Sequence, residues 1–581
     1  MPTVDTDATT TGFRASRGLD PHHPDRYKWT ALSNTTLGVF MAMLNSSIVV
    51  ISLPAIFRGI HLDPLRASNI GYLLWLLQGY MVVTAVLVVT LGRIGDMFGR
   101  VRMYNAGFAV FTLASVALAF SPATGTGGAM ALIILRVVQG IGGALLMANS
   151  TAILTDAFPM KERGMALGFN IVAAIFGTFV GLLLGGLLAD VNWRLIFLVS
   201  VPIGLFGTIW AYAKLHDSGE RAPARIDWWG NLTFAAGLVG IMMGLTYGLI
   251  PYGGHAMGWS SPLVLGSLSS GVLLLCAFTA IELRVLQPMF HLALFRIRAF
   301  TGAGLASLLA SMGRGGMQFM LILWLQGIWL PLHGYTFEQT PLWSGIYLIP
   351  LSAGFLAAGP IAGRLSDHLG QRWFSTMGML GAAATFLALL ALPVDFSYPV
   401  FAVIILLNGI CIGLFSAPNT TTMMNAVPAG QRGAASGMRA TFMNSGFVLS
   451  IGIFFSLMIV GLSTTLPRAM SNGLVAQGVP LAVAHRVANL PPVGTLFAAF
   501  LGYNPIRTLL GPSVLAHMGR TQVAAVTGKS FFPALISAPF HHGLVVVFTA
   551  AVLLCALASL ASWWAGDSGH SDAMDVADTP S

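Results

Sequence analysis

The chain has 581 residues, of which 56% are hydrophobic and only 8% are charged. This composition excludes a single water-soluble globule, because too few polar residues remain to cover the surface of so large a core. The formal net charge of +9 does not indicate nucleic-acid binding, since the basic residues gather at the ends of apolar runs, where they set membrane topology.

Apolar runs that are long enough to cross a bilayer recur along nearly the whole chain and predict an all-α polytopic membrane protein. A hydrocarbon core about 30 Å thick requires roughly 20 apolar residues per helix. We expect fourteen spans, near residues 30–54, 70–91, 103–121, 129–154, 164–188, 193–213, 228–250, 261–283, 299–330, 342–362, 373–392, 398–424, 434–461 and 541–565. The polar stretch before the first span lacks the short apolar core of a signal peptide, so the first span itself should direct insertion.

Basic residues at the span ends indicate the orientation, because their translocation is disfavoured. With a cytoplasmic N-terminus, the cytoplasmic connections hold Arg93, Arg100, Arg102, Lys161, Arg163, Lys214, Arg221, Arg225, Arg284, Arg296, Arg298, Arg364, Arg372 and Arg432. An even number of spans then places both termini in the cytoplasm. We expect a multi-pass protein of the plasma (inner) membrane.

Signals for enzyme chemistry or a cofactor are not found in the sequence. The three cysteines, Cys276, Cys411 and Cys555, lie inside apolar spans and show no metal-ligand or redox spacing. We also find no P-loop, no zinc spacing and no nucleophile elbow in a fitting context. We therefore expect neither a metal nor a cofactor, and neither an enzyme nor a self-contained ATP-driven pump.

Two short connections resemble each other and indicate an internal duplication. They read GRIGDMFGR, Gly92 to Arg100, and GRLSDHLGQR, Gly363 to Arg372. Glycines allow a tight turn, and the carboxylate can accept bonds from the amides of the next helix or pair with arginine. We assign a conformational role to these residues: Gly92, Asp96, Gly99, Arg100, Gly363, Asp367, Gly370 and Arg372.

The first of these connections resembles the signature loop of the major facilitator superfamily. Further similar stretches follow in the expected order: LIILRVVQG (Leu132 to Gly140), GTFVGLLLGG (Gly177 to Gly186) and NWRLIFLVSVPIG (Asn192 to Gly204). With an extra helix pair between the halves, the chain resembles the fourteen-helix drug/proton antiporter branch of multidrug efflux type. The resemblance implies alternating access by rocking of two bundles, with Asp96 helping to latch one state.

The same resemblance implies two six-helix bundles with an inserted two-helix pair. The expected parts are a cytoplasmic N-terminal tail (1–29), an N-terminal six-helix bundle (30–214), the inserted pair with its linkers (215–298), the first five helices of the C-terminal bundle (299–461), an extracytoplasmic loop (462–540), the last helix of that bundle (541–565) and a cytoplasmic tail (566–581).

The first span departs from the pattern of this branch, which resembles LDxTIVNVALP. Here the stretch is LNSSIVVISLP, so Asn45 occupies the acidic position. An amide cannot exchange a proton as a carboxylate can. No Asp, Glu or His lies near the middle of any expected span. We assign transport and coupling to Arg136 and Gln139 in the fourth span, and to Asp96 and Asp190 at the membrane edges.

Polar side chains within the spans are candidates for a substrate cavity, and we expect it to contain Asn45, Gln78, Arg314, Gln318 and Asn444. Arg314 lies in GRGGMQ, where glycines could open the helix to a wet cavity. Arg439 could line the cavity or extend to the cytoplasmic interface. Arginines without a carboxylate would disfavour cationic cargo, so we expect neutral or anionic cargo.

The fifth span carries Gly177, Gly181 and Gly185 at a spacing of four, which permits close helix contact. Both a role in transport and plain helix packing are consistent with these glycines. Leu182 occupies a position where the antiporter signature has proline, so no backbone break is expected there. Between the last two spans, the moderately apolar segment 462–540 predicts short amphipathic helices at the extracytoplasmic mouth, where a partner could bind.

These features predict a secondary active transporter that exports hydrophobic or amphiphilic, drug-like small molecules across the plasma membrane by alternating access, with protons as the expected coupling ion. Two alternatives remain open. The chain could move lipids or lipid precursors, or it could be a non-transporting receptor or assembly factor on a transporter scaffold. The bilayer and a small hydrophobic substrate are the expected partners, and nucleic acid is not.

Overall fold

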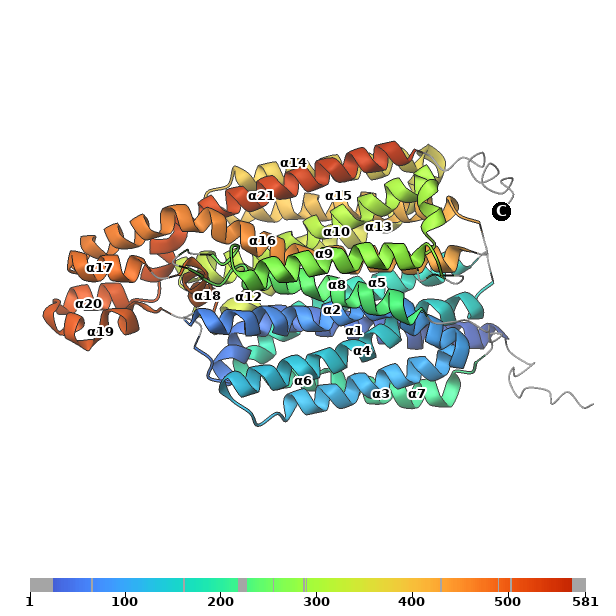
Figure 1. Ribbon diagram of the computed structural model, residues 1–581, viewed down its shortest axis with the longest axis horizontal. Helices are drawn as coiled ribbons and strands as arrows, with labels where there is room; N and C mark the ends of the chain where they lie inside the picture. Colours follow the sequence, from blue (N-terminus) through green and yellow to red (C-terminus); the bar gives the residue numbers. More distant parts are fainter. Residues whose placement is uncertain are drawn as a thin grey trace, which may run out of the picture.

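The computed structural model describes residues 24–566, except for 64–65, 160–161, 218–226, 254, 256, 286–287, 289, 429–430, 490 and 502–503. Within this part, fourteen helices are long and apolar enough to cross a membrane. The predicted number of spans is therefore confirmed. The helices form two bundles, one drawn in blue to cyan and one in yellow-green to red in Figure 1.

The N-terminal bundle is built from the first seven helices. They are α1 (Pro24–Gly59), α2 (Ala67–Phe98), α3 (Arg100–Ala119), α4 (Gly125–Ala157), α5 (Arg163–Val191), α6 (Leu195–Leu198) and α7 (Ser200–Lys214). The last two share one membrane span. An inserted pair follows, α8 (Trp228–Tyr247) and α9 (Pro262–Glu282), and α8 packs against α2 of one bundle and α16 of the other.

The C-terminal bundle contains the remaining membrane-spanning helices and the short helical segments that continue them. They are α10 (Arg298–Trp324), which continues through the π-helix η2 (Leu325–Trp329) into α11 (Leu330–Leu332), then α12 (Thr340–Tyr347) with α13 (Ile349–Leu369), α14 (Gln371–Leu390), α15 (Tyr398–Asn425), α16 (Arg432–Ala476) and α21 (Phe531–Ala565). A short 3-10 helix, η1 (Leu292–Arg296), leads into α10.

Close approach of α1 and α5 organises the N-terminal bundle, and three glycines make it possible. A Cβ at Gly177, Gly181 or Gly185 would lie 2.5, 2.4 and 2.8 Å from the backbone oxygens of successive turns of α1. No side chain fits at such distances, so the glycine spacing serves backbone contact between these two helices. Of the two roles considered for these glycines, helix packing is observed, and a role in transport remains a prediction.

The two related connections have the same backbone geometry. Gly99 and Gly370 have φ values of 109° and 94°, in the region that favours glycine, and each separates two long helices. Their N–H groups donate to the carbonyl oxygens of Gly95 and Ser366 at 2.9 and 3.1 Å. The internal repeat read from the sequence therefore corresponds to a repeated helix–glycine–helix turn.

The last two membrane helices are longer than predicted. At 1.5 Å per residue, the 45 residues of α16 span about 67 Å, and α21 starts at Phe531 instead of 541. The intervening segment is correspondingly shorter and forms four short helices: α17 (Leu481–Ala488), α18 (Pro492–Phe500), α19 (Ile506–His517) and α20 (Arg520–Thr527). Figure 1 shows them at one end of the molecule, opposite the C-terminus.

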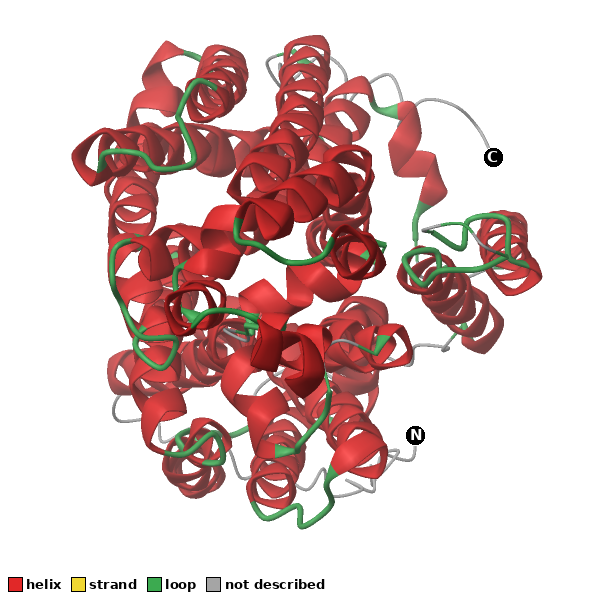
Figure 2. Cartoon of the chain, turned by 90° about the vertical axis from the view of Figure 1, so that its left-hand side faces the viewer, coloured by secondary structure: helices red, strands yellow, loops and turns green. Residues whose placement is uncertain are grey.

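We call this end the loop side and the end where α1 begins and α21 ends the terminus side. Seen from the loop side in Figure 2, the short helices lie over the ends of the long ones. Every residue of α18 is buried, and α18 packs against α2, α16 and η2. Phe497 stacks on Phe455 of α16 with ring centroids 4.8 Å apart. Short helices were predicted in this segment, and α18 fills space between the two bundles.

Candidate functional site

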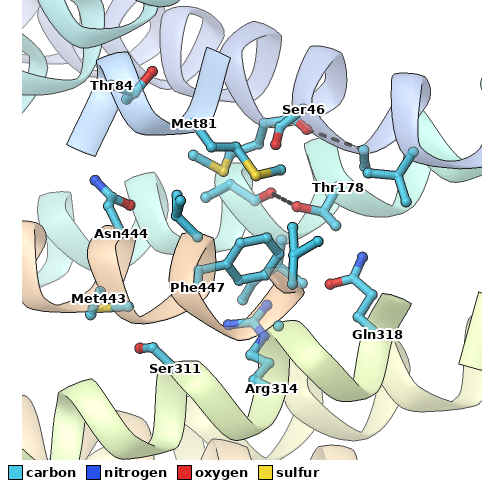
Figure 3. Close-up of a pocket in the computed structure, with 18 of the residues that line it drawn as sticks. Ser46, Met81, Thr84, Thr178, Ser311, Arg314, Gln318, Met443, Asn444 and Phe447 are labelled. Carbon is cyan, nitrogen blue, oxygen red and sulfur yellow. Dashed lines mark hydrogen bonds between the residues drawn. The ribbon is translucent and has the colours of Figure 1, made fainter. Parts of the chain in front are cut away.

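A cavity of about 300 Å³ lies between the two bundles. Residues from α1, α2, α4 and α5 line one wall, and residues from α10, α13, α15 and α16 line the other. Figure 3 shows the side chains of both walls pointing toward the same space. The cavity therefore lies where two bundles that move against each other would meet.

The wall from the C-terminal bundle carries the cationic groups. Arg314 on α10 and Arg439 on α16 both line the cavity, together with Gln318 and Asn444. The Arg314 guanidinium carbon lies 4.8 Å from the centroid of the Phe355 ring. The Nε of Arg439 donates to the Thr420 hydroxyl at 3.2 Å. Of the two alternatives left open for Arg439, the structure shows the cavity position.

The wall from the N-terminal bundle is neutral. Its polar groups are hydroxyls, such as Ser47, which donates to the Met43 carbonyl oxygen at 3.1 Å, and Thr178, which donates to Ala174 at 3.0 Å. Thioethers of Met43, Met81 and Met147 also line this wall. Methionine side chains adapt to ligands of different shape, so this wall favours apolar contact without a fixed geometry.

Arg136, predicted as a coupling residue, lies inside the N-terminal bundle and is fully buried. Its Nη1 donates to the amide oxygens of Asn45 and of Gln139, the latter at 2.7 Å. Its guanidinium also lies over the Tyr80 ring, 4.6 Å from the centroid. The Asn45 amide donates to the Ser200 hydroxyl at 3.3 Å. Helices α1, α2, α4 and α7 thus share one polar network around a cation.

The prediction that Asn45 lines the cavity is corrected by this network. Asn45 is fully buried and faces α4 and α7, whereas its neighbours Ser46 and Ser47 face the cavity. A helix turns by about 100° per residue, so adjacent residues point in different directions. Gln78 also does not line the cavity: it is fully buried near Gly452 of α16. Its side-chain atoms have no hydrogen-bond partner among the described residues.

The first signature turn holds an ion-pair network at the terminus side. Arg100 Nε lies 2.7 Å from an oxygen of Asp96, and its Nη1 lies 2.6 Å from Asp156 on α4. The Asp217 carboxylate accepts from the Val101 amide at 2.8 Å at the start of α3. Asp217 was not predicted, because it is distant in sequence and belongs to no motif.

The second turn differs in its contacts. The Arg372 guanidinium lies over the Trp563 ring of α21, 3.5 Å from the centroid. The side chains of Asp367 and Asp190 lie outside the described part of the structure. Their predicted roles therefore remain predictions.

Comparison with known proteins identifies the family. The model of the Major Facilitator Superfamily matches residues 35–314 and 226–451. The chain belongs to this superfamily, and its fourteen helices fit the drug-efflux type within it. It is a multi-pass membrane protein and not an enzyme.

Several curated relatives are named as resistance or export proteins. The tetracenomycin C resistance and export protein of Streptomyces glaucescens is 30% identical over 478 residues, which cover 81% of this chain and 84% of the relative. The methylenomycin A resistance protein of Bacillus subtilis is 30% identical over 455 residues, covering 77% and 91%.

Among solved structures, a bacterial homolog of the human lysosomal transporter Spinster, in an inward-facing and unoccupied conformation, covers 94% of this chain and 98% of its own. It has a TM-score of 0.55 and 15% identity. At this identity the similarity concerns the fold alone.

Proposed function

We propose that this protein exports hydrophobic or amphiphilic, drug-like small molecules across the plasma membrane by alternating access, with both termini in the cytoplasm. The observation that carries the proposal is the cavity between the bundles, with apolar and hydroxyl groups on one wall and cationic groups on the other. Such a lining suits a ligand with an apolar body and a polar end. The names of the resistance and export relatives support this class of cargo.

Alternating access requires contacts between the bundles that can separate, and the loop side has them. Gln326 of η2 donates to the Ile51 carbonyl oxygen of α1 at 3.3 Å. A Cβ at Gly186 of α5 would lie 2.3 Å from the Cα of Leu342 in α12. Basic residues of the other side indicate that the loop side is extracytoplasmic. Release of cargo would therefore break these contacts.

Charge favours neutral or anionic cargo over cationic cargo. Arg314 and Arg439 line the cavity, and no Asp or Glu is found among its described lining residues. A cation that enters this space meets like charge at reduced dielectric, where repulsion is stronger than in water. The resemblance to proton antiporters implies a proton gradient as energy source. Dye flux should therefore be measured both with and without an imposed pH gradient.

A reversible cross-link across the loop side tests the proposal. A Cβ at Gly345 of α12 would lie 3.4 Å from the Ile51 Cδ1 atom. We would combine Ile51→Cys with Gly345→Cys after replacing the native cysteines. Flux of the neutral dye N-phenylnaphthylamine would then be measured in proteoliposomes. Cross-linking should stop the flux and reduction should restore it, whereas each single cysteine variant should be unaffected by the oxidant.

Two outcomes would contradict the proposal. Full flux through the cross-linked protein would mean that the bundles do not separate on the loop side. No flux of neutral, anionic or cationic dye through the unmodified protein, with or without a pH gradient, would favour a non-transporting receptor or assembly factor.

A further inference from the structure

All charged groups in the described lining of the cavity are cationic. They are Arg314 and Arg439, which come from two helices of the same bundle. Arg314 lies over the face of Phe355, and Arg439 donates to a neutral hydroxyl. Neither has an ion-pair partner among the described residues. The cavity therefore contains two fixed positive charges and needs a counter-charge from elsewhere.

Two acidic residues at the membrane edge are engaged outside the cavity. Asp96 and Asp156 both pair with Arg100 at the terminus side. Arg136, the other deep cation, binds the amide oxygens of Asn45 and Gln139. Arginine does not release its proton in proteins. Among the described residues, we therefore find no carboxylate or imidazole in the cavity that could exchange a proton against cargo.

We infer that the cargo itself supplies the negative charge: the protein exports small aromatic organic anions, and the membrane potential drives their exit. This inference rests on the proposed transport function and names its substrate class and driving force. A carboxylate or sulfonate can accept two parallel bonds from a guanidinium. Phe355 and Phe447, which also line the cavity, offer apolar surface to the rings of the same ligand.

The energy balance follows from the charge that crosses the membrane in a full cycle. The fixed arginines return to their starting position, so only the charge of the anion is moved. A potential that is negative inside favours its exit. Because one charge across 100 mV corresponds to about 2.3 kcal/mol, the anion ratio at equilibrium would reach roughly fiftyfold per 100 mV. No proton has to move in the opposite direction.

A matched pair of dyes tests the inference. Anilinonaphthalene sulfonate carries a permanent negative charge, and N-phenylnaphthylamine has the same ring system without the sulfonate. Proteoliposomes at equal pH on both sides would receive a potassium gradient with valinomycin to make the inside positive. We expect the sulfonate to accumulate inside as the potential rises, while flux of the neutral dye stays independent of potential. Protein-free vesicles provide the background.

Variants show whether the two arginines bind the anion. Arg314→Gln and Arg439→Gln should each lower the ratio of sulfonate flux to neutral-dye flux roughly tenfold or more, as expected for loss of a charge-assisted bond. Arg507→Gln, at an exposed position on α19, is the matched control and should leave this ratio unchanged. A thermal denaturation midpoint close to that of wild type shows that the variants are folded.

Each contrary result has a distinct meaning. Sulfonate accumulation that follows a pH gradient at clamped zero potential would overturn the inference in favour of proton antiport. Transport of ethidium as fast as that of the sulfonate would overturn the substrate class. Neutral-dye flux without sulfonate flux would also overturn it, while leaving transport itself in place. Absence of flux for every dye would instead contradict the proposed function.

Discussion

Alanine at Gly181 should separate α1 from α5 and destabilise the N-terminal bundle. A new Cβ would lie 2.1 Å from the Ser47 hydroxyl oxygen and 2.4 Å from the Leu44 carbonyl oxygen. The hydroxyl can rotate away, but the carbonyl belongs to the backbone of α1. To restore an ordinary contact of at least 3.4 Å, α1 would have to move by about 1 Å. Overpacking of this kind costs about 1–3 kcal/mol.

Gly168 on the same helix provides the control, because a Cβ there meets no atom within 4 Å. Both substitutions gain about 1 kcal/mol of helix propensity, so the difference between them isolates the steric term. We would compare thermal denaturation midpoints of the detergent-purified proteins. Gly181→Ala should melt below wild type or close to it, and Gly168→Ala at or above it. Equal midpoints for the two variants would refute the close-packing argument.

Three further changes are predicted from the structure. Asn45→Asp would place a carboxylate against the buried guanidinium of Arg136. We expect the free energy of unfolding to rise by about 1–3 kcal/mol and the melting midpoint to rise with it. A lower midpoint would show that the amide network already satisfies the cation. Gly99→Ala should destabilise the folded protein by about 1–2 kcal/mol, because φ at Gly99 is 109° and the new Cβ would lie 2.5 Å from a carboxylate oxygen of Asp217. An unchanged midpoint of chemical denaturation would contradict this prediction. Asp227→Ala should cost about 1 kcal/mol by removing the cap of α8, whereas Asp227→Asn should cost little; equal losses of thermal stability would exclude capping as the cause.

The fold could be predicted from the sequence because membrane spans are determined by length and hydropathy. Each of the fourteen helices appears as an apolar run, and the repeated turn appears as a repeated motif. The ends of α16 and α21 could not be predicted in this way. A bilayer requires apolar residues only where lipid is met, and these helices continue beyond that region, supported by contacts with each other and with the short helices of the loop side.

The candidate site was only partly predictable. Arg314, Gln318 and Asn444 were expected in the cavity on the basis of polarity within apolar spans, and they line it. The same criterion selected Asn45, which binds Arg136 across 91 residues of sequence instead. Polarity indicates that a side chain needs a partner, but not whether that partner is a ligand or another helix. That distinction depends on the rotation of each helix within its bundle.

The proposed cargo class depends on the positive charge of the cavity, which can be tested by dye binding to the purified protein without a membrane. Fluorescence titration of the detergent-purified protein would compare anilinonaphthalene sulfonate, N-phenylnaphthylamine and ethidium, in wild type and in Arg314→Gln. We expect the sulfonate to bind wild type more tightly than ethidium does, and we expect the substitution to weaken sulfonate binding by roughly tenfold or more while neutral-dye binding is retained. Equal affinity for the sulfonate and the cation, unaltered in Arg314→Gln, would contradict it.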